Sequence, residues 1–323
     1  MTKGLSIQPQ DIINGDRTAL ARAITLAEST LSEDSVWVRD VLGRLMPLTG
    51  NAVRLAVTGP PGAGKSTFIE ALGMVLVNGG KKVAVLSVDP SSTRTGGSIL
   101  GDKTRMTGLS RSPHAFIRPS PSAGQSGGVS AGIRESILFC EAAGYDFIII
   151  ETVGVGQSEV AVRDMVDCFL LLLIAGAGDE LQGLKKGIME MADLIVINKD
   201  DGENRSAVQR AVSELSNVLR LLDSGDGPPP ELLTCSALNN TGITEIADSI
   251  NKFTLRSKDS GRWQQLRNEQ KIIWLDEMIK NHLYKLFRSD GLLPDRRAAA
   301  GVDILAGKKN VFEAMDYVLQ KDQ

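Results

Sequence analysis

Residues 59–66 read Gly-Pro-Pro-Gly-Ala-Gly-Lys-Ser, which places a lysine and a hydroxyl directly after a glycine-rich turn. This is the P-loop pattern G-x-x-x-x-G-K-[ST], and it follows the apolar run 54–58. Glycines let the backbone wrap a polyphosphate, and the amides of the turn and of the next helix attract anions. We therefore expect Lys65 to reach the β- and γ-phosphates of a nucleoside triphosphate and Ser66 to ligate Mg²⁺. The residues predicted to bind nucleotide in this segment are Gly59, Pro60, Pro61, Gly62, Ala63, Gly64, Lys65, Ser66 and Thr67.

A second motif predicts which base is bound. Asn198-Lys199-Asp200-Asp201 has the form N-K-x-D and follows the apolar run 194–198. The Asp201 carboxylate can accept hydrogen bonds from guanine N1–H and the 2-amino group, and adenine has neither donor at those positions. Asn198 would brace the loop and Lys199 would lie along the base. After the last predicted strand, the turn Ser236, Ala237 and Leu238 offers the Ala237 N–H to guanine O6, so we expect GTP and GDP rather than ATP.

Acidic residues follow two other predicted strands. Glu151, with Gly154 three residues later, ends the run 147–151, and Asp89 ends the run 83–88. In P-loop proteins such an acid meets the Mg²⁺ shell and such a glycine bonds the γ-phosphate. The polar loop 93–105 carries Asp102 between glycines and could move over the γ-phosphate toward Mg²⁺. The predicted metal residues are thus Ser66, Asp89, Asp102 and Glu151, and the predicted catalytic residues are Lys65, Asp102, Glu151 and Gly154.

Position 155, directly after Gly154, is valine, where many regulatory GTPases place a water-orienting glutamine. An apolar side chain cannot orient water, so we expect slow unassisted hydrolysis and a switch rather than a metabolic catalyst. Gln157 and a group supplied by a partner remain alternative activators. The loop 174–187, with its glycines, two acids and two lysines, is interpreted as a third mobile element that reports nucleotide state.

The elements that position these residues form an α/β pattern. Nearly continuous apolar runs at 54–58, 83–88, 115–118, 147–151, 168–175, 194–198 and 231–235 predict strands covered on both faces. Helices are expected to begin near Lys65, Gly128, Ser158, Leu181, Asn204 and Gly242. The fold class is therefore a doubly wound, mainly parallel sheet, with the ligand at the carboxyl ends of the strands.

Helical periodicity flanks this pattern on both sides. Residues 1–47 are predicted to form an N-terminal helical segment, residues 48–255 the P-loop domain, and residues 256–323 a C-terminal helical arm. Apolar residues from Trp263 to Leu286 mark a long amphipathic helix. Its apolar stripe must be buried on the domain itself or on another subunit, and periodicity does not choose between them.

Composition excludes several classes of function. The net charge is −3, from 36 basic and 39 acidic residues, with none of the basic excess typical of nucleic-acid binding. No apolar run reaches the roughly 18 residues needed to span a bilayer, and the first residues lack an apolar signal core. Cys140, Cys168 and Cys235 lie in separate apolar stretches and are expected to be reduced. A cytoplasmic protein without a membrane or nucleic-acid partner is the expectation.

Taken in order, several long strings resemble the MeaB/ArgK family of P-loop GTPases over about residues 14–255. They are the P-loop, Asp89-Pro-Ser-Ser, 96–105, 151–159, 178–186 and Asn198-Lys-Asp-Asp201. The resemblance implies a GTPase that gates adenosylcobalamin loading of methylmalonyl-CoA mutase and protects that enzyme. It also implies that Asp179–Lys186 couples to the mutase, and that the C-terminal arm forms a homodimer.

Other classes fit less well. A nickel metallochaperone GTPase needs a relay of His and Cys, and the chain has two histidines and no paired cysteines. A signal-recognition-particle GTPase needs a basic, Met-rich domain. A kinase or transport-associated ATPase would use the same phosphate site, but N-K-x-D argues against ATP.

Overall fold

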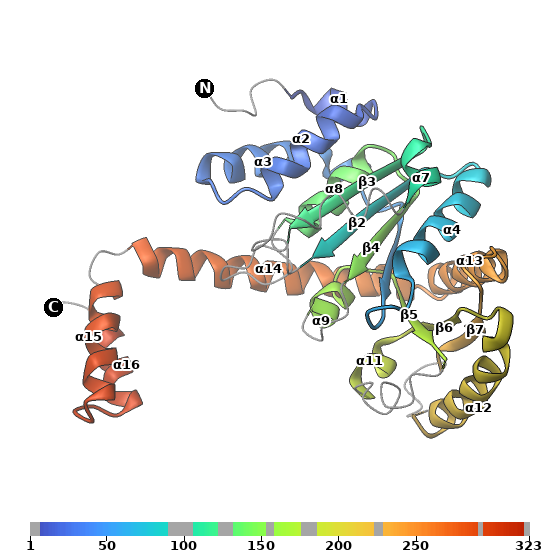
Figure 1. The fold of residues 1–323 in the computed structure, drawn as a ribbon. Helices are drawn as coiled ribbons and strands as arrows, with labels where there is room; N and C mark the ends of the chain where they lie inside the picture. The colour runs from blue at the N-terminus through green and yellow to red at the C-terminus, as the bar shows by residue number, and fades with distance from the viewer. Residues whose placement is uncertain are drawn as a thin grey trace. The chain divides into compact units, whose positions relative to one another are not determined.

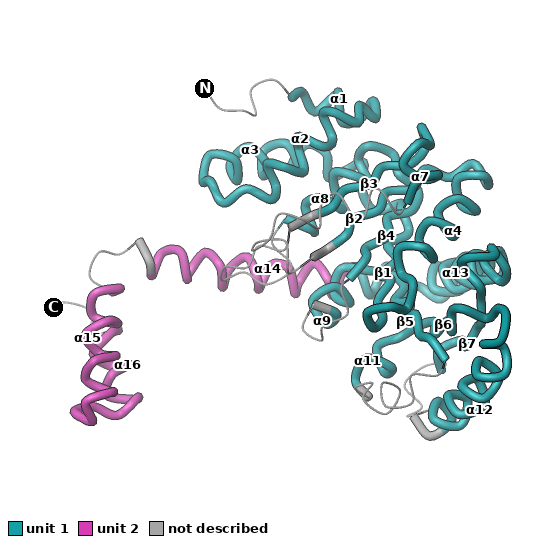
Figure 2. The backbone as a smooth tube through the Cα atoms, in the orientation of Figure 1, with its two compact units in different colours: residues 1–267 teal, residues 268–323 magenta. Residues whose placement is uncertain are grey.

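The computed structural model describes residues 7–89, 106–121, 132–152, 158–175, 186–222, 229–289 and 293–319. They fall into two compact units, residues 1–267 and 268–323 (Figure 2). The first unit contains the sheet.

Seven parallel strands form one sheet in the order β3-β2-β4-β1-β5-β6-β7 (Figure 1). Their bounds are β1 Val53–Thr58, β2 Val83–Asp89, β3 Ala115–Pro121, β4 Phe147–Thr152, β5 Cys168–Ile174, β6 Leu194–Asn198 and β7 Glu231–Thr234. The central strands are buried along almost their whole length, which is why they read as continuous apolar runs. The predicted doubly wound α/β fold is confirmed.

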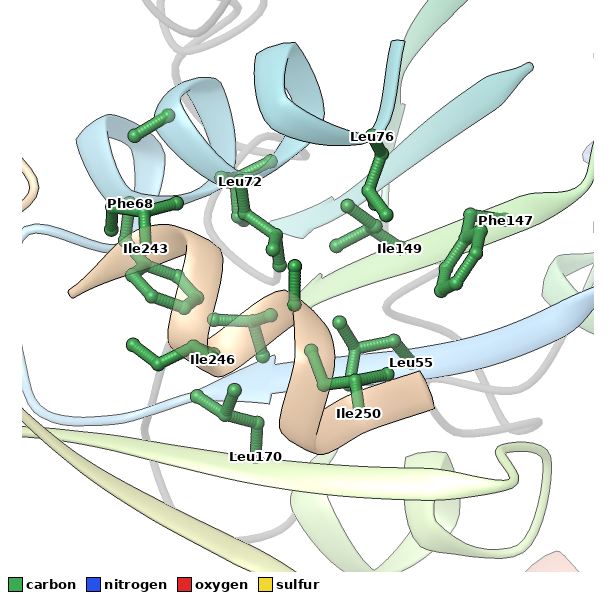
Figure 3. Packing of buried hydrophobic residues seen from close by; sticks show 14 of the residues in the cluster. Leu55, Phe68, Leu72, Leu76, Phe147, Ile149, Leu170, Ile243, Ile246 and Ile250 are labelled. Carbon is green, nitrogen blue, oxygen red and sulfur yellow. The ribbon is translucent and has the colours of Figure 1, made fainter. Parts of the chain in front are cut away.

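The helices of the sheet unit alternate with the strands. They are α4 Lys65–Asn78, α7 Thr107–Arg111, α8 Ile133–Ala142, α9 Ser158–Arg163, α11 Lys186–Met191, α12 Arg205–Leu222 and α13 Ile243–Asp259. Helices α4 and α13 lie side by side, and their apolar side chains pack on one face of the sheet (Figure 3). Phe68 and Leu72 of α4 and Ile246 of α13 are fully buried there, against Leu55 and Leu170. This packing fixes the start of α4, and with it the P-loop.

The predicted N-terminal helical segment contains α1 Pro9–Ile13, α2 Arg17–Ala27 and α3 Ser32–Leu45. Both α2 and α3 pack against α8, and the Trp37 ring lies 6.3 Å from that of Phe139. The Asp16 side chain caps α2 by accepting hydrogen bonds from the amides of Thr18 and Ala19.

Helix α14, Arg262–Ser289, begins in the first unit and continues into the second, and it confirms the long helix expected from Trp263 to Leu286. The second unit also contains α15 Leu293–Leu305 and α16 Val311–Leu319, which pack on each other. The Asn310 side chain caps α16. The division at residues 47 and 255 stays a prediction. Within the described residues, no helix is long and apolar enough to cross a membrane.

Candidate functional site

The P-loop connects β1 to α4, at the carboxyl end of the central strand. Gly59 has φ +151°, and a Cβ there would lie 2.0 Å from the Leu172 carbonyl oxygen. Gly64, at φ +87°, precedes α4, and no side chain of the described residues caps the first turn of that helix. Since the first-turn amides of a helix have no partner within it, they are available to an anion. Only glycine fits at residue 59, where the chain leaves β1 and enters the loop.

The Lys65 ammonium lies inside the loop. Its Nζ donates to the Gly59 carbonyl at 2.7 Å and to the Pro60 carbonyl at 3.1 Å. Burial lowers the pKa of Lys65, while the negative charges of Glu151 and Glu159 oppose that effect. Among the described residues, the hydrogen bonds of this partly buried cation go to neutral carbonyls, which favours a negatively charged ligand. The loop thus fits a polyphosphate.

The carboxylate of Glu151 joins two hydroxyls at the same edge of the sheet. It accepts hydrogen bonds from Ser66 Oγ at 3.0 Å and from Ser87 Oγ at 3.1 Å. A buried carboxylate beside a hydroxyl is a set of hard oxygen donors, which fits Mg²⁺. The structure therefore brings together two of the predicted metal residues, Ser66 and Glu151.

Ser87 was missed by sequence reasoning. It lies on β2 directly beside Glu151 in the parallel register of β2 and β4. Ser87 is a polar residue within an apolar strand, which was visible in the sequence. Its contact with Glu151 could be inferred only when the strand order was known, because that order places β2 next to β4. Thr58 and Thr152, whose hydroxyls are 2.8 Å apart, were missed in the same way.

The N-K-x-D loop follows β6 and lies against both the P-loop and the turn after β7. Asn198 Nδ2 donates to the Ala63 carbonyl at 2.9 Å, and Asn198 Oδ1 accepts from the Ala237 amide at 3.0 Å. The predicted bracing role of Asn198 thus has direct contacts on both sides. In this structure the Ala237 N–H, which we expected to meet guanine O6, is engaged by Asn198.

Asp201 accepts a hydrogen bond from the Ser236 hydroxyl through Oδ2. Among the described residues, no hydrogen bond is made to its Oδ1, so this oxygen retains capacity for a base. Lys199 is exposed and has a left-handed backbone, φ +64°. Leu238 is 77% exposed beside this turn. All the predicted base-reading residues thus lie in one place.

Other predicted site residues lie outside the described part of the chain. They are Asp102, Gly154, Val155, Gln157 and Asp179–Lys185, together with the side chains of Asp89 and Lys186. The backbone of Asp89 ends β2, at the same sheet edge as Glu151. The roles of these residues in metal binding, hydrolysis and coupling stay predictions.

Comparison with known proteins finds a matching family model and several similar sequences. A family model described as "Methylmalonyl Co-A mutase-associated GTPase MeaB" matches residues 20–291. The GTPase ArgK of Escherichia coli (strain K12) is 54% identical over 275 residues, which cover 84% of this chain and 83% of the relative. The mitochondrial methylmalonic aciduria type A homolog of Mus musculus is 41% identical over 338 residues, covering 99% of this chain and 81% of that protein.

A solved structure gives the same result at the level of the fold. A crystal structure described as a LAO/AO transport system kinase is 40% identical, with a TM-score of 0.76. The match covers 96% of this chain and 94% of that one. The matched regions include both the P-loop and the N-K-x-D loop.

Proposed function

The chain belongs to the MeaB family of methylmalonyl-CoA mutase-associated GTPases, and from this we propose that it gates adenosylcobalamin loading of a methylmalonyl-CoA mutase and protects that enzyme. Hydrolysis of GTP is the activity of the family, and the residues of the site fit it. The names of the family and of the mouse relative support association with the mutase. Control of adenosylcobalamin loading is proposed in addition to this association.

One observation carries the guanine-nucleotide part of the proposal. The Asn198 side chain bonds the P-loop at Ala63 and the turn after β7 at Ala237, so the proposed phosphate and base subsites would be held as one unit. In the bound state, Lys65 would exchange the Gly59 and Pro60 carbonyls for phosphate oxygens. The Oδ1 of Asp201, which has no bond from the described residues, would accept from the guanine ring. Mg²⁺ held near Ser66 and Glu151 would neutralise charge on the β- and γ-phosphates.

Slow hydrolysis, accelerated by a partner, is the second part of the proposal. It is supported by Val155, which cannot orient an attacking water. A slow GTPase keeps two long-lived states, and a partner that accelerates hydrolysis converts one into the other. The segment Asp179–Lys186 is proposed as the element that couples this change to the mutase.

Homodimerisation is proposed for the C-terminal helices. Along α14, Ile272, Leu275, Ile279, Leu283 and Leu286 repeat at spacings of three and four residues, and each is about half exposed or more in the single chain. An apolar stripe of this kind on a helix needs a partner surface, and a second copy supplies an identical one. Light scattering of the Leu275→Glu/Leu283→Glu variant should show a monomer if the stripe is the interface; an unchanged dimer would contradict it.

The experiment that tests the function compares two nucleotides in two proteins. We expect an adenosylcobalamin-dependent methylmalonyl-CoA mutase to accelerate phosphate release from GTP by the wild-type chain. The Asp201→Asn variant should lose this response with GTP and regain it with XTP, because the amide matches the xanthine carbonyl. Fast hydrolysis without the mutase, or transfer of the γ-phosphate to a protein or an amino acid, would overturn the proposal.

A further inference from the structure

Three consecutive side chains after β7 each bond a residue of the N-K-x-D loop. Thr234 Oγ1 donates to Asp200 Oδ2 at 2.9 Å, Cys235 Sγ donates to Asn198 Oδ1 at 3.5 Å, and Ser236 Oγ donates to Asp201. Backbone bonds run in parallel, from the Asp200 amide to the Cys235 carbonyl and from the Cys235 amide to the Ile197 carbonyl, both at 2.9 Å. The loop is therefore attached to this short segment at nearly every residue.

The segment that carries these donors is itself fixed. Ser236 and Thr241 exchange two backbone hydrogen bonds, at 3.0 and 3.1 Å, which close the turn between them. Gly242, at φ +78°, lies so close to the segment that a Cβ would be 2.5 Å from the Thr234 carbonyl oxygen. Thr234 belongs to β7, which is paired with β6. The donors thus project from a rigid support.

The N-K-x-D loop, in contrast, contains strain. Lys199 adopts φ +64°, a left-handed backbone that is strained for a residue with a Cβ. Such a conformation persists only when its surroundings over-determine it. The residues on either side of Lys199 are the ones bonded by Cys235 and Thr234, and the Lys199 carbonyl accepts from Asn204 Nδ2 at 2.8 Å. These bonds supply the needed constraint.

We propose that Thr234 and Cys235 are positioning residues for the base: Thr234 holds the loop through Asp200, and Cys235 fixes the orientation of Asn198. The inference rests on the proposed guanine site and extends it to two residues that do not touch the base. Because the two acceptors flank Lys199, loss of either donor lets the loop relax and moves the Asp201 carboxylate away from the base. Recognition of the guanine 2-amino group, which needs Asp201 in a defined place, should be most affected.

A thiol suits the position of Cys235. The side chain is 2% exposed, and burial, aided by the charge of Asp200, raises its pKa to about 12. The thiol therefore remains protonated and can donate to Asn198 Oδ1, which also accepts from the Ala237 amide. With both acceptor directions of Oδ1 used, the Asn198 Nδ2 is directed toward Ala63 of the P-loop.

The test measures affinity for GDP and for IDP, which lacks the 2-amino group, by calorimetry on the full chain. Wild type should prefer GDP because Asp201 bonds that group. Thr234→Val and Cys235→Ala should each lower the GDP:IDP affinity ratio about three- to tenfold, the value of one hydrogen bond. Thr234→Ser and Cys235→Ser keep a donor and should restore most of the ratio.

Matched controls separate positioning from stability. Thr254→Val removes a buried hydroxyl without a hydrogen-bond partner among the described residues, and Cys140→Ala removes a buried thiol in α8. Both should leave the ratio unchanged, and a general loss of stability would weaken GDP and IDP equally. If wild type prefers GDP while Thr234→Val and Cys235→Ala keep the full ratio, the positioning role is wrong. If wild type does not bind GDP, the proposed function itself fails.

Discussion

The two ends of the sheet both hold buried polar groups, but they use them differently. At the amino ends of the strands, Arg54, Glu141, Asp167 and Arg267 form a closed network in which each charge meets an opposite one. At the carboxyl ends, the hydrogen bonds that Lys65 makes to described residues go to neutral carbonyls of its own loop, and Asp201 keeps an oxygen without a bond from the described residues. A network that satisfies itself stabilises the fold, whereas groups with spare bonding capacity bind a ligand.

The details of the closed network support this contrast. Arg267 donates to both oxygens of Asp167, at 2.8 and 2.7 Å, and to the Ala52 carbonyl at 2.6 Å. Arg54 donates to both oxygens of Glu141, each at 2.9 Å. Two positive and two negative charges cancel, so little electrostatic attraction for a ligand remains. The network instead fastens the first turns of α14 to β1.

Disruption of the closed network should have the greatest consequence for the protein. Arg267→Ala leaves Glu141 and Asp167 with fewer partners in a buried place and should lower the free energy of unfolding by about 3–5 kcal/mol. Denaturant titration of the nucleotide-free protein measures this. Arg210→Ala, at an exposed position of α12, is the matched control and should change stability by about 0.5 kcal/mol or less.

GDP affinity of the folded Arg267→Ala protein should be close to that of wild type, because the network lies at the other end of the strands. A large loss of affinity at a temperature where the variant is fully folded would show that the two ends are coupled, and the comparison would then fail.

The opposite outcome is expected for Lys65→Met. Here the fold loses a partly buried cation held by neutral groups, so stability should change little or rise. Phosphate release from GTP should fall at least about 100-fold, since a cation near the developing charge of the γ-phosphate is worth several kcal/mol. The rate of GTP turnover and the thermal unfolding of the same preparation measure the loss of hydrolysis and the change in stability. Hydrolysis within tenfold of wild type would remove Lys65 from the catalytic set.

The sequence indicated which loops lie at the carboxyl ends of the strands, called here the open end of the sheet, but it did not indicate the closed network at the amino ends, and the reason is physical. The P-loop and the N-K-x-D loop are short sequence motifs, in which glycine spacing and a few neighbouring side chains carry the chemistry. Buried parallel strands can be predicted because they are continuous apolar runs. The network depends on tertiary proximity instead, since Arg267 meets Glu141 across 126 residues of chain. Arg54 opens a predicted strand, but nothing local indicates its partner. Thr234 and Cys235 were likewise visible only as part of a strand end.

The pH dependence of GDP binding should follow the ionisation of Lys65. Burial lowers the pKa of Lys65 in the nucleotide-free protein, and bound phosphate would raise it again. Above the lowered pKa, binding must therefore take up a proton, and GDP affinity falls as pH rises, by at most about tenfold per pH unit. Calorimetry in alkaline buffers of different ionisation enthalpy measures this uptake. The Lys65→Met protein should show none of this proton uptake, and uptake that persists there would assign the proton to another group.

Ser87→Ala, a substitution at the carboxyl end of β2, should have the mildest effect. Ser87 does not reach the P-loop, but its hydroxyl holds one oxygen of Glu151 while Ser66 holds the other. Without Ser87 the carboxylate loses one of the bonds that orient it toward Ser66, so the Mg²⁺ concentration needed for half-maximal GTP affinity should rise about two- to tenfold.

Affinity for GDP without Mg²⁺ should remain unchanged, which separates a metal effect from a general one. Ser136→Ala in α8 removes another buried hydroxyl, which donates to the Gly132 carbonyl directly before the helix, and it should leave the Mg²⁺ titration as in wild type. If Ser87→Ala also leaves the titration unchanged, Glu151 is held by its other contacts alone, and the spare capacity of this end resides in the loops rather than in the strand ends.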